Sequence, residues 1–302
     1  MIAAGIDLGG TKIEAQVFDE NWQRTATNRI ATPTTYAALV QAMATQIAWA
    51  TAQAGTVPIG ICAAGLVNPA TGLALTANLP ASGKPFPADI AAAAHQPITY
   101  INDCRAQALS EAMFGAARGF ATAMALNLGT GIAGGIVVDG RLLHSPSGTG
   151  GEFGHFPISA VPIVKHGLPV LACGCGRMGC TETLIAGPGL QRLARLKTGR
   201  DLSTHAITEN RQTDPALAAV WAIWLELVTD LLITLTLTAD PACIVLAGGL
   251  AQVDGLLPEL TASLQSAQLG DFAIPTLRLA EGGDATGARG AAYAAWREAG
   301  HG

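Results

Sequence analysis

Three of the six cysteines of this chain lie within eight consecutive positions, in the sequence CGCGRMGC. They are Cys173, Cys175 and Cys180, and His155 precedes the first of them by 18 residues in a glycine-rich segment. One imidazole and three thiolates are sufficient ligands for a tetrahedral structural zinc ion. A disulfide or a set of free thiols is the alternative, and a reducing cytoplasm disfavours the disulfide. We therefore predict that these four residues bind Zn²⁺.

A carboxylate that could act as a general base ends an apolar stretch in the sequence YINDCRAQ. Asp103 lies where we expect a strand to end and a helix to begin. Its side chain could do no more than cap that helix, because Asp is a preferred N-cap residue. The alternative role is chemical, since phosphoryl transfer needs a carboxylate that orients the attacking hydroxyl and accepts its proton. The residues alone leave both roles open.

Two glycine-rich turns, DLGGTK and LGTGIAGG, follow apolar strands and could bind an anion. Consecutive backbone N–H groups that no side chain covers form anion sites. The hydroxyls of Thr11 and Thr130 and the cation of Lys12 add donors. Either turn alone could be a tight hairpin without a ligand, and neither matches a Walker A or Rossmann fingerprint. Together with a third glycine pair after a strand, Gly248 and Gly249, they predict a nucleotide site between two lobes.

The composition indicates a chain with a large apolar core. Half of the 302 residues are hydrophobic, 13% are charged, and the net charge is −5. Because no run of basic residues occurs, we expect neither nucleic acid nor a membrane surface as a partner. The first residues lack the basic segment of a signal peptide. The long uncharged stretch 120–138 is interrupted by glycines, which is typical of strand–turn–strand rather than of a membrane span. We therefore expect a cytoplasmic protein.

Strands and helices alternate through the first 115 residues, which predicts an α/β fold. The expected elements are strands at 2–7, 13–18, 59–63 and 98–101, and helices at 34–54, after Asp103, from Asp214 to before Asp240, and at the C-terminus. The strand–turn–strand pattern repeats at an offset of 120 residues, which aligns Asp7 with Asn127 and Asp19 with Asp139. This repeat predicts two related domains.

Taken together, these motifs resemble those of the bacterial sugar kinases of the ROK family (repressor, open reading frame, kinase). The motifs are GIDLGGTK, NDCRAQA, LGTGIAGG, GEFGH, CGCGRMGCTE, VLAGGL and GDATGARGAA, which extend from Gly5 to about Trp296. The resemblance implies the two-lobed actin-like ATPase fold, which is ribonuclease H-like, with a cleft between the lobes. The expected lobes are residues 1–117, joined by a C-terminal helix at 288–302, and residues 118–287, which contain the zinc loop.

The resemblance also implies roles for individual residues. Asp103 would be the catalytic base, and Mg²⁺ would lie near Asp7. The expected ATP-binding residues are Asp7, Gly9, Gly10, Thr11, Lys12, Gly129, Thr130, Gly131, Gly248 and Gly249. The expected sugar-binding residues are Asn78, Asn102, Asp103, Glu152, His155 and Glu182. His155 would use one ring nitrogen for zinc and direct the other at the sugar.

Within the family, the loop TANLPASGKPF at 76–86 resembles that of the N-acetyl-D-glucosamine kinases. We therefore expect ATP-dependent phosphorylation of this sugar at its 6-hydroxyl. Glucokinase or fructokinase activity is the alternative within the class. A non-catalytic sugar sensor or a repressor is the alternative from another class, but Asp103 is present, and a first strand at Ile2 leaves no space for an N-terminal helix-turn-helix. Since family members are often dimers, we also expect a homodimer.

The chain departs from many family members at three positions beside the expected base. Ile101 stands where many have an acidic residue, Cys104 where they have alanine, and Arg105 where they have asparagine. None of the three is an expected catalytic group, but each bears on the shape of the expected sugar site. The segment 156–172 is also longer than in many relatives, as suits an N-acetylglucosamine kinase.

Overall fold

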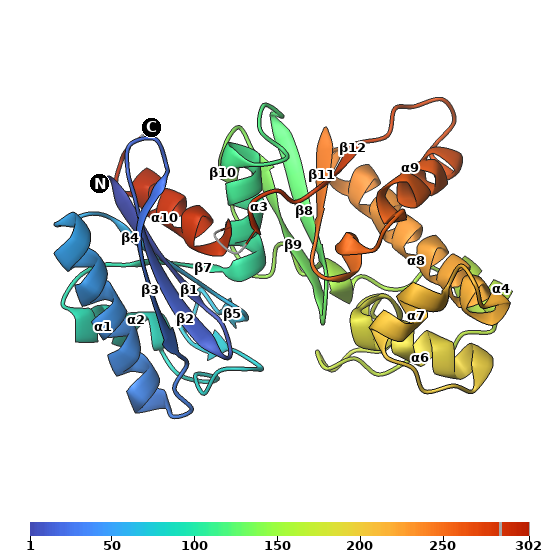
Figure 1. Cartoon of the computed structure of the whole chain (residues 1–302), viewed down its shortest axis with the longest axis horizontal. Coiled ribbons are helices and arrows are strands. Elements are labelled where there is room, and N and C mark those ends of the chain that lie inside the picture. The colour runs from blue at the N-terminus through green and yellow to red at the C-terminus, as the bar shows by residue number, and fades with distance from the viewer. Residues whose placement is uncertain (284–285, 302) are drawn as a thin grey trace. The chain divides into compact units, whose positions relative to one another are not determined.

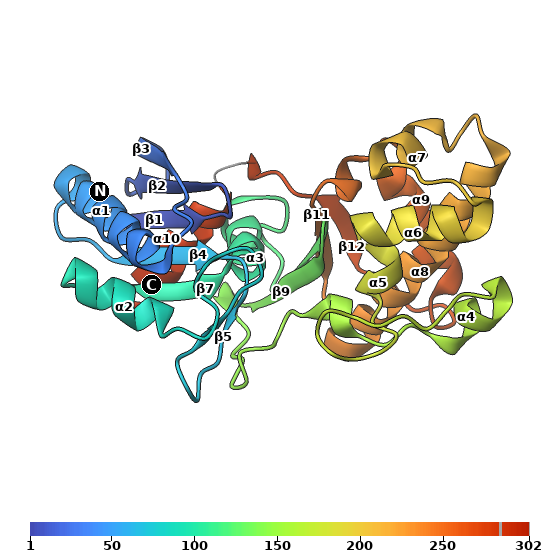
Figure 2. The same cartoon turned by 90° about the horizontal axis from the view of Figure 1, so that it is seen from below.

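The computed structural model describes residues 1–283 and 286–301. The chain folds into two compact units: residues 1–119, 135–151 and the described residues from 281 onward form the first, and residues 120–134 and 152–280 form the second. Two five-stranded sheets carry the fold (Figures 1 and 2). The predicted α/β class is confirmed. The predicted lobe boundaries and the cleft between the lobes stay predictions, and Asp284, Ala285 and Gly302 lie outside the described residues.

The first sheet has the strand order β3-β2-β1-β4-β7. Its strands are β1 (Ala3–Leu8), β2 (Lys12–Phe18), β3 (Arg24–Ala31), β4 (Ile59–Ala63) and β7 (Thr99–Asn102). The helices of this unit are α1 (Tyr36–Ala54), α2 (Phe86–Ala94), α3 (Asp103–Phe114) and α10 (Thr286–Glu298), and β5 (Leu66–Val67) pairs with β6 (Ala74–Leu75). β2 is antiparallel to β1 and β3, whereas β4 is parallel to β1 and β7.

Successive residues of β1 face opposite sides of the sheet, as the two-residue period of a strand requires. Ala4, Ile6 and Leu8 belong to the apolar core that includes Leu39 and Met43 of α1. The residues between them lie on the side of α10, which packs on β1, β4 and α3. The first sheet is therefore covered on both faces by helices.

The contact between α10 and the sheet depends on glycine. A Cβ atom added to Gly5 would lie 1.8 Å from the carbonyl oxygen of Ala288, and one added to Gly60 would lie 1.8 Å from that of Ala291. No side chain fits at such distances, so glycine is required where the helix backbone meets the strands. The contact brings the last described helix of the chain against its first strand.

The second sheet has the order β10-β9-β8-β11-β12. Its strands are β8 (Thr122–Leu128), β9 (Ile132–Val138), β10 (Arg141–Leu142), β11 (Cys243–Ala247) and β12 (Thr276–Leu279). The helices that follow β10 are η1 (Phe153–His155), α4 (Ala160–His166), α5 (Glu182–Ile185), α6 (Gly187–Thr198), α7 (Thr204–Asn210), α8 (Pro215–Ala239), η2 (Leu250–Gln252) and α9 (Leu256–Ala267). The long helix α8 packs against α5, α6 and α9.

The predicted internal repeat is present in the structure. β1 ends at Leu8 and β2 begins at Lys12, while β8 ends at Leu128 and β9 begins at Ile132, so both pairs differ by the expected 120 residues. The central strand of each sheet has the next strand of the chain on one side and a later strand on the other. The strands of the two sheets are therefore connected in the same order.

Helix α8 begins as the sequence predicts. The side chain of Asp214 accepts hydrogen bonds from the backbone N–H groups of Ala216 and Leu217, and Pro215 occupies the first helical position. Among the described helices, α8 alone is long and apolar enough to cross a membrane, but 56% of its most apolar stretch is buried. Trp224 is fully buried, and its indole donates a hydrogen bond of 2.8 Å to the carbonyl of Ile185. These contacts are those of a core helix.

Candidate functional site

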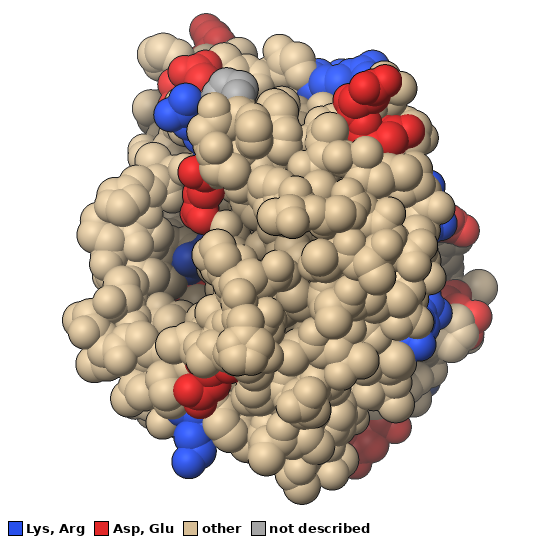
Figure 3. Space-filling view, turned by 90° about the vertical axis from the view of Figure 1, so that its left-hand side faces the viewer, with Lys and Arg blue, Asp and Glu red and all other residues tan. Residues whose placement is uncertain are grey.

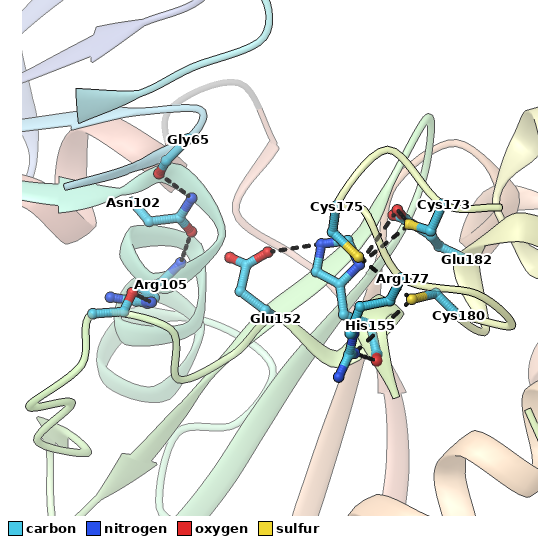
Figure 4. Close-up of polar contacts among 11 residues, drawn as sticks. Gly65, Asn102, Arg105, Glu152, His155, Cys173, Cys175, Arg177, Cys180 and Glu182 are labelled. Carbon is cyan, nitrogen blue, oxygen red and sulfur yellow. Dashed lines mark hydrogen bonds and ion pairs between the residues drawn. The ribbon is translucent and has the colours of Figure 1, made fainter. Parts of the chain in front are cut away.

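The four predicted zinc ligands come together in the second unit (Figure 4). The ligand atoms of His155, Cys173, Cys175 and Cys180 all lie within 4.8 Å of one another. His155 Nδ1 is 3.6 Å from Cys173 Sγ, and Cys175 Sγ is 3.6 Å from Cys180 Sγ. The ligand atoms of a tetrahedral zinc ion are roughly 3.3–3.8 Å apart, because Zn–N and Zn–S bonds are about 2.0–2.3 Å. The two distances of 3.6 Å match a tetrahedral zinc site, and the donor set is one that zinc takes.

The ionisation of these thiols also fits a cation. The backbone N–H of Arg177 lowers the pKa of the exposed Cys175 to about 6. Burial raises the pKa of Cys173 to about 12. Three adjacent thiols cannot all become thiolates unless a positive charge offsets their repulsion. None of the described cysteines forms a disulfide.

Short backbone contacts shape the loop that carries the thiols. Pro157 pairs with Cys180 and Ala172 with Met178 as isolated β-bridges. The side chain of Arg177 donates hydrogen bonds to the carbonyl oxygen of His155 and, at 3.9 Å, to the sulfur of Cys180. His155 of η1 is thus connected to the cysteine loop by the hydrogen bond from the Arg177 side chain and by the bridge between Pro157 and Cys180.

Two carboxylates lie against opposite sides of the His155 ring (Figure 4). Glu182 Oε1 is 3.5 Å from Nδ1 and 3.1 Å from the sulfur of Cys173. Glu152 Oε2 is 3.8 Å from Nε2. The nitrogen nearer the thiols is therefore Nδ1, and Nε2 faces a carboxylate that can accept hydrogen bonds. The structure brings Glu152, His155 and Glu182 together, as expected from the sequence.

The glycine turn between β8 and β9 lies beside the same cluster. A Cβ atom added to Gly131 would be 3.7 Å from Glu182 Oε2. The N–H of Gly187, the first residue of α6, donates a hydrogen bond of 2.8 Å to the carbonyl of Gly129. The N-terminus of a helix carries free N–H groups and favours an anion. Gly187 was missed by the sequence reasoning, although the local sequence AGPG, with proline in the first turn, is a helix-start signal.

Of the third glycine pair, Gly248 packs against the end of β8 and Gly249 lines a cavity. Gly248 has φ 86° and packs so tightly that a Cβ atom would lie 2.2 Å from Oδ1 of Asn127. Its neighbour Gly249 lines a cavity of about 650 Å³ together with residues of α7, η2 and the segments that follow them. Thr208 and Gln252 are among the polar residues of its wall. A nucleoside-sized group fits a cavity of this volume, which is within the usual range for small-molecule sites.

The base candidate lies at the carboxyl end of β7 in the first unit. Asn102, not Asp103, is the N-cap of α3: its Oδ1 accepts hydrogen bonds from the N–H groups of Cys104 and Arg105 at 3.0 and 3.2 Å (Figure 4). The helix begins at Asp103 itself, one residue earlier than expected. The cap role that could have explained Asp103 is therefore filled by its neighbour. Asp103 accepts a hydrogen bond of 2.8 Å from Cys104 N–H and is half-buried.

The amide of Asn102 is engaged on both sides. While Oδ1 caps the helix, Nδ2 donates a hydrogen bond of 3.1 Å to the carbonyl of Gly65. This holds the segment after β4 against the end of β7. Asn102 is expected to bind sugar, and in this structure its established contacts are with the backbone.

Asp7 lies near enough to Asp103 for the charge of Asp103 to affect its pKa. Burial, together with the negative charge of Asp103, raises the pKa of Asp7 from 3.8 to about 6. A hydrogen bond with the thiol of Cys62 opposes this effect. A buried carboxylate whose pKa is raised by a neighbouring negative charge is typical of a functional site and would be favoured by a bound cation. The residues expected to hold Mg²⁺ and to act as base are thus electrostatically coupled.

The remaining first-unit candidates form an exposed turn. The N–H of Gly9 donates a hydrogen bond of 2.9 Å to the carbonyl of Lys12, while Gly10, Thr11 and Lys12 are exposed. A Cβ atom added to Gly10 would be 3.4 Å from the side chain of Asn78, so the loop that carries Asn78 lies on the turn. The structure therefore places Asn78 with the predicted phosphate-binding residues of this unit. In the second unit Thr130 is likewise exposed at the tip of its turn.

The three departures from the family pattern have defined positions. Cys104 is buried, and Ile101 is half-buried on β7. Arg105 donates a hydrogen bond of 2.5 Å to the carbonyl of Gly148, which lies in the glycine-rich segment before Glu152. Arg105 thus holds a loop of the first unit.

The duplicated sheet with glycine turns between paired strands is the arrangement of the two-domain, actin-like ATPases. The model of one family, described as the ROK family, matches residues 3–298. The chain therefore belongs to the ROK family.

Two relatives share about a third of their residues with this chain over nearly its full length. An N-acetylgalactosamine kinase of Shewanella sp. (strain ANA-3) is 36% identical over 292 residues, which cover 95% of this chain and 94% of the relative. An N-acetyl-D-glucosamine kinase of Yersinia pseudotuberculosis serotype O:1b (strain IP 31758) is 35% identical over 295 residues, which cover 96% and 97%. Among solved structures, the ROK hexokinase from Thermus thermophilus has a TM-score of 0.89 and 33% identity, with full coverage of both chains.

Proposed function

We propose that this protein is an ATP-dependent sugar kinase that phosphorylates N-acetyl-D-glucosamine at the 6-hydroxyl. The observation that carries the proposal is the pair of carboxylates, Glu152 and Glu182, that lie on the two nitrogens of His155 beside a zinc-type cluster. Carboxylates and an imidazole in this arrangement can bind several neighbouring hydroxyls of one sugar ring. The relatives that act on N-acetylhexosamines, by name, support the same class of substrate.

In this proposal the proton is taken by Asp103. Its carboxylate orients the 6-hydroxyl and accepts the proton as the sugar oxygen bonds to the γ-phosphorus of ATP. The bond between the γ-phosphorus and the β,γ-bridging oxygen breaks, and ADP leaves. Asn102 fixes the direction of Asp103 because it caps the helix in which Asp103 is the first residue.

The glycine turns would bind the phosphates of the nucleotide. The N–H groups of Gly9 and Gly129 close their own turns by donating to the carbonyls of Lys12 and Gly131. The N–H groups of Gly10 and Gly131 would then donate to phosphate oxygens. The cavity at Gly249 would take the nucleoside. Mg²⁺, when bound, neutralises phosphate charge, and Asp7 is the residue that would hold it or its water ligands.

Zinc would have a structural task. Four protein ligands complete a tetrahedral site and leave no position for a reactive water. Zinc would therefore hold the loop that places Glu152 and Glu182, and would take no part in the transfer. We also propose a cytoplasmic location and a homodimer. The homodimer rests on the sequence resemblance, and sedimentation analysis measures it. On the face drawn in Figure 3, positive side chains do not gather into a patch that would favour nucleic acid.

A sugar panel tests the proposal directly. N-acetyl-D-glucosamine, N-acetyl-D-galactosamine, glucose and fructose are supplied with ATP and Mg²⁺, kcat/KM is measured for each, and the product is assigned by NMR. We expect N-acetyl-D-glucosamine to have the highest kcat/KM and glucose a lower one, with phosphate on oxygen 6. A higher value for glucose or fructose would refute the substrate and leave the kinase class. A higher kcat/KM for N-acetyl-D-galactosamine, which differs from N-acetyl-D-glucosamine only in the configuration at carbon 4, would make it the substrate instead. No phosphorylation of any sugar would refute the kinase.

A further inference from the structure

Helix α3 contains a buried acid that has no part in the site described above. Glu111 is fully buried, yet it lies outside the expected sugar, nucleotide and zinc residues. A buried carboxylate is costly unless hydrogen bonds or opposite charge compensate it. The hydrogen-bond partners of Glu111 therefore indicate its role.

The Glu111 side chain accepts hydrogen bonds from three backbone N–H groups. Oε2 accepts from Ala116 at 2.9 Å and from Glu281 at 3.1 Å, while Oε1 accepts from Gly282 at 2.8 Å. Ala116 follows the end of α3, whereas Glu281 and Gly282 are 170 and 171 residues away in the sequence. One side chain thus holds two distant segments of backbone.

The chain crosses four times between the two units, and these two segments lie beside the first and the last of the crossings. The chain passes into the second unit after Gly119 and returns for the last time at Glu281. Glu111 therefore binds the outgoing connection three residues before it leaves and the returning connection where it arrives. A hydrogen bond to a charged acceptor is about twice as strong as a neutral one, so these are firm attachments.

Glycines on both connections make this approach possible. A Cβ atom added to Gly115 would be 2.2 Å from Oε2 of Glu111, and one added to Gly282 would be 2.9 Å from Oε1. Gly119, the last residue before the chain leaves, has φ 90° and open space around it. The outgoing connection is therefore held tightly at one point and is free to turn just beyond it.

The charge of Glu111 is compensated within the same unit. The guanidinium of Arg289, on α10, interacts electrostatically with it. Arg289 donates a hydrogen bond of 3.1 Å to Ser110 and stacks on Phe114, with its central carbon 5.0 Å from the ring centre. Helices α3 and α10 thus form a rigid base for the two connections.

We propose that Glu111 is a positioning residue for the kinase reaction, and that it fastens the first and the last of the four connections to α3, which limits how far the second unit moves relative to Asp103. Asp103 begins α3 and Glu111 follows eight residues later, about 12 Å along the same helix. The base and the attachment point are therefore joined by one rigid element. The proposal rests on the proposed function for its consequence in catalysis, but not for the attachment itself.

The test replaces Glu111 with glutamine, which has the same shape. The amide has one acceptor oxygen, and its NH₂ group would face backbone N–H groups, so at least one of the three hydrogen bonds is lost. The distance between the units is followed by single-molecule energy transfer between dyes on non-natural residues at Gln41 and Gln265, which are exposed on α1 and α9. We expect Glu111→Gln to broaden the distance distribution without ligands. We also expect a sugar KM raised roughly tenfold, with a smaller change in kcat.

The matched control is Leu109→Ala, a cavity in the same helix at a buried residue. It should lower the melting temperature to a similar extent and leave the distance distribution as in the wild type. An unchanged distribution in Glu111→Gln, or equal broadening in Leu109→Ala, would overturn the proposal. If Glu111→Gln does not fold, Glu111→Asp is measured instead, since it keeps the charge but is one methylene too short to hold both connections. Broadening in a protein that phosphorylates no sugar would support the attachment and refute the proposed function.

Discussion

Asn102 and Asp103 are neighbours in the sequence and have different tasks in the structure. Asn102 caps α3 through Oδ1, and this frees Asp103 from the capping role that a strand-to-helix junction suggests. Asp103 is left half-buried at the end of a strand, with one oxygen held by the N–H of Cys104. A carboxylate held at one oxygen can still accept a proton on the other.

The variant Asp103→Asn should keep the fold and lose the chemistry. The amide oxygen can still accept the N–H of Cys104, so the start of α3 should persist. Without a basic group, kcat should fall by about 10²–10⁴-fold while the sugar KM changes little. The control is Asp89→Asn, which alters a carboxylate that accepts a hydrogen bond from Tyr36 in the same unit. Its kcat should equal that of the wild type. A near wild-type kcat for Asp103→Asn would remove it from the role of base.

The raised pKa of Asp7 predicts a dependence of stability on pH. Because the folded protein holds this proton up to about pH 6 and the unfolded chain only to about 3.8, the folded state binds more protons between these values. The free energy of unfolding should therefore fall as the pH rises through this window, by at most about 3 kcal/mol. Denaturant titrations of the wild type and Asp7→Asn at pH 4 and pH 7, without magnesium, measure the difference. The stability gained by Asp7→Asn should be larger at pH 7, and an equal gain at both values would contradict the prediction.

At the scale of elements, the cysteine loop cannot be stabilised by apolar packing. Val170 and Met178 are 56% and 61% exposed, and the loop between them is mainly glycine, cysteine and polar residues. Ordering each residue of such a loop costs about 1–2 kcal/mol. A bound zinc ion can offset this cost because metal-binding free energy becomes local folding free energy.

We predict one zinc ion per chain and its loss in Cys180→Ser. Elemental analysis measures the metal. Because Glu152 and Glu182 lie beside ligand residues, losing the metal should raise the sugar KM roughly tenfold or more, whereas nucleotide affinity without sugar should change less than about twofold. Cys243→Ser, at a buried thiol of β11 outside the cluster, should keep its zinc. A zinc-free wild type with full activity would show that the loop has another purpose.

At the scale of the whole molecule, the first unit is completed by the last described helix. Helix α10 packs on β1, β4 and α3 through backbone contacts that only glycine permits. The first strand of the chain therefore acquires its full cover only when the C-terminal segment has been made. Glu111 belongs to the same arrangement, since it binds the connection that leads into α10.

The sequence by itself determined the features that depend on neighbouring residues. The glycine turns, the repeat of 120 residues, the Asp214 cap and the grouping of His155 with three cysteines could be predicted, because each depends on short, regular spacing. β3 was missed, since Arg24–Ala31 is an edge strand with alternately exposed residues and no apolar run. The sequence also could not show whether Asn102 or Asp103 caps α3, because Asn and Asp are both preferred N-cap residues.

Only the tertiary structure decided which distant groups meet. Gly187 donates a hydrogen bond to the carbonyl of Gly129, and nothing in its local sequence indicates that partner. In the sequence, nothing distinguishes Glu111 from other acidic residues of helices. In the structure, its carboxylate accepts hydrogen bonds from the N–H groups of Glu281 and Gly282, which lie 170 and 171 residues later. Such contacts have no pattern in the sequence, because a hydrogen bond to the backbone does not depend on which side chain the donor residue carries.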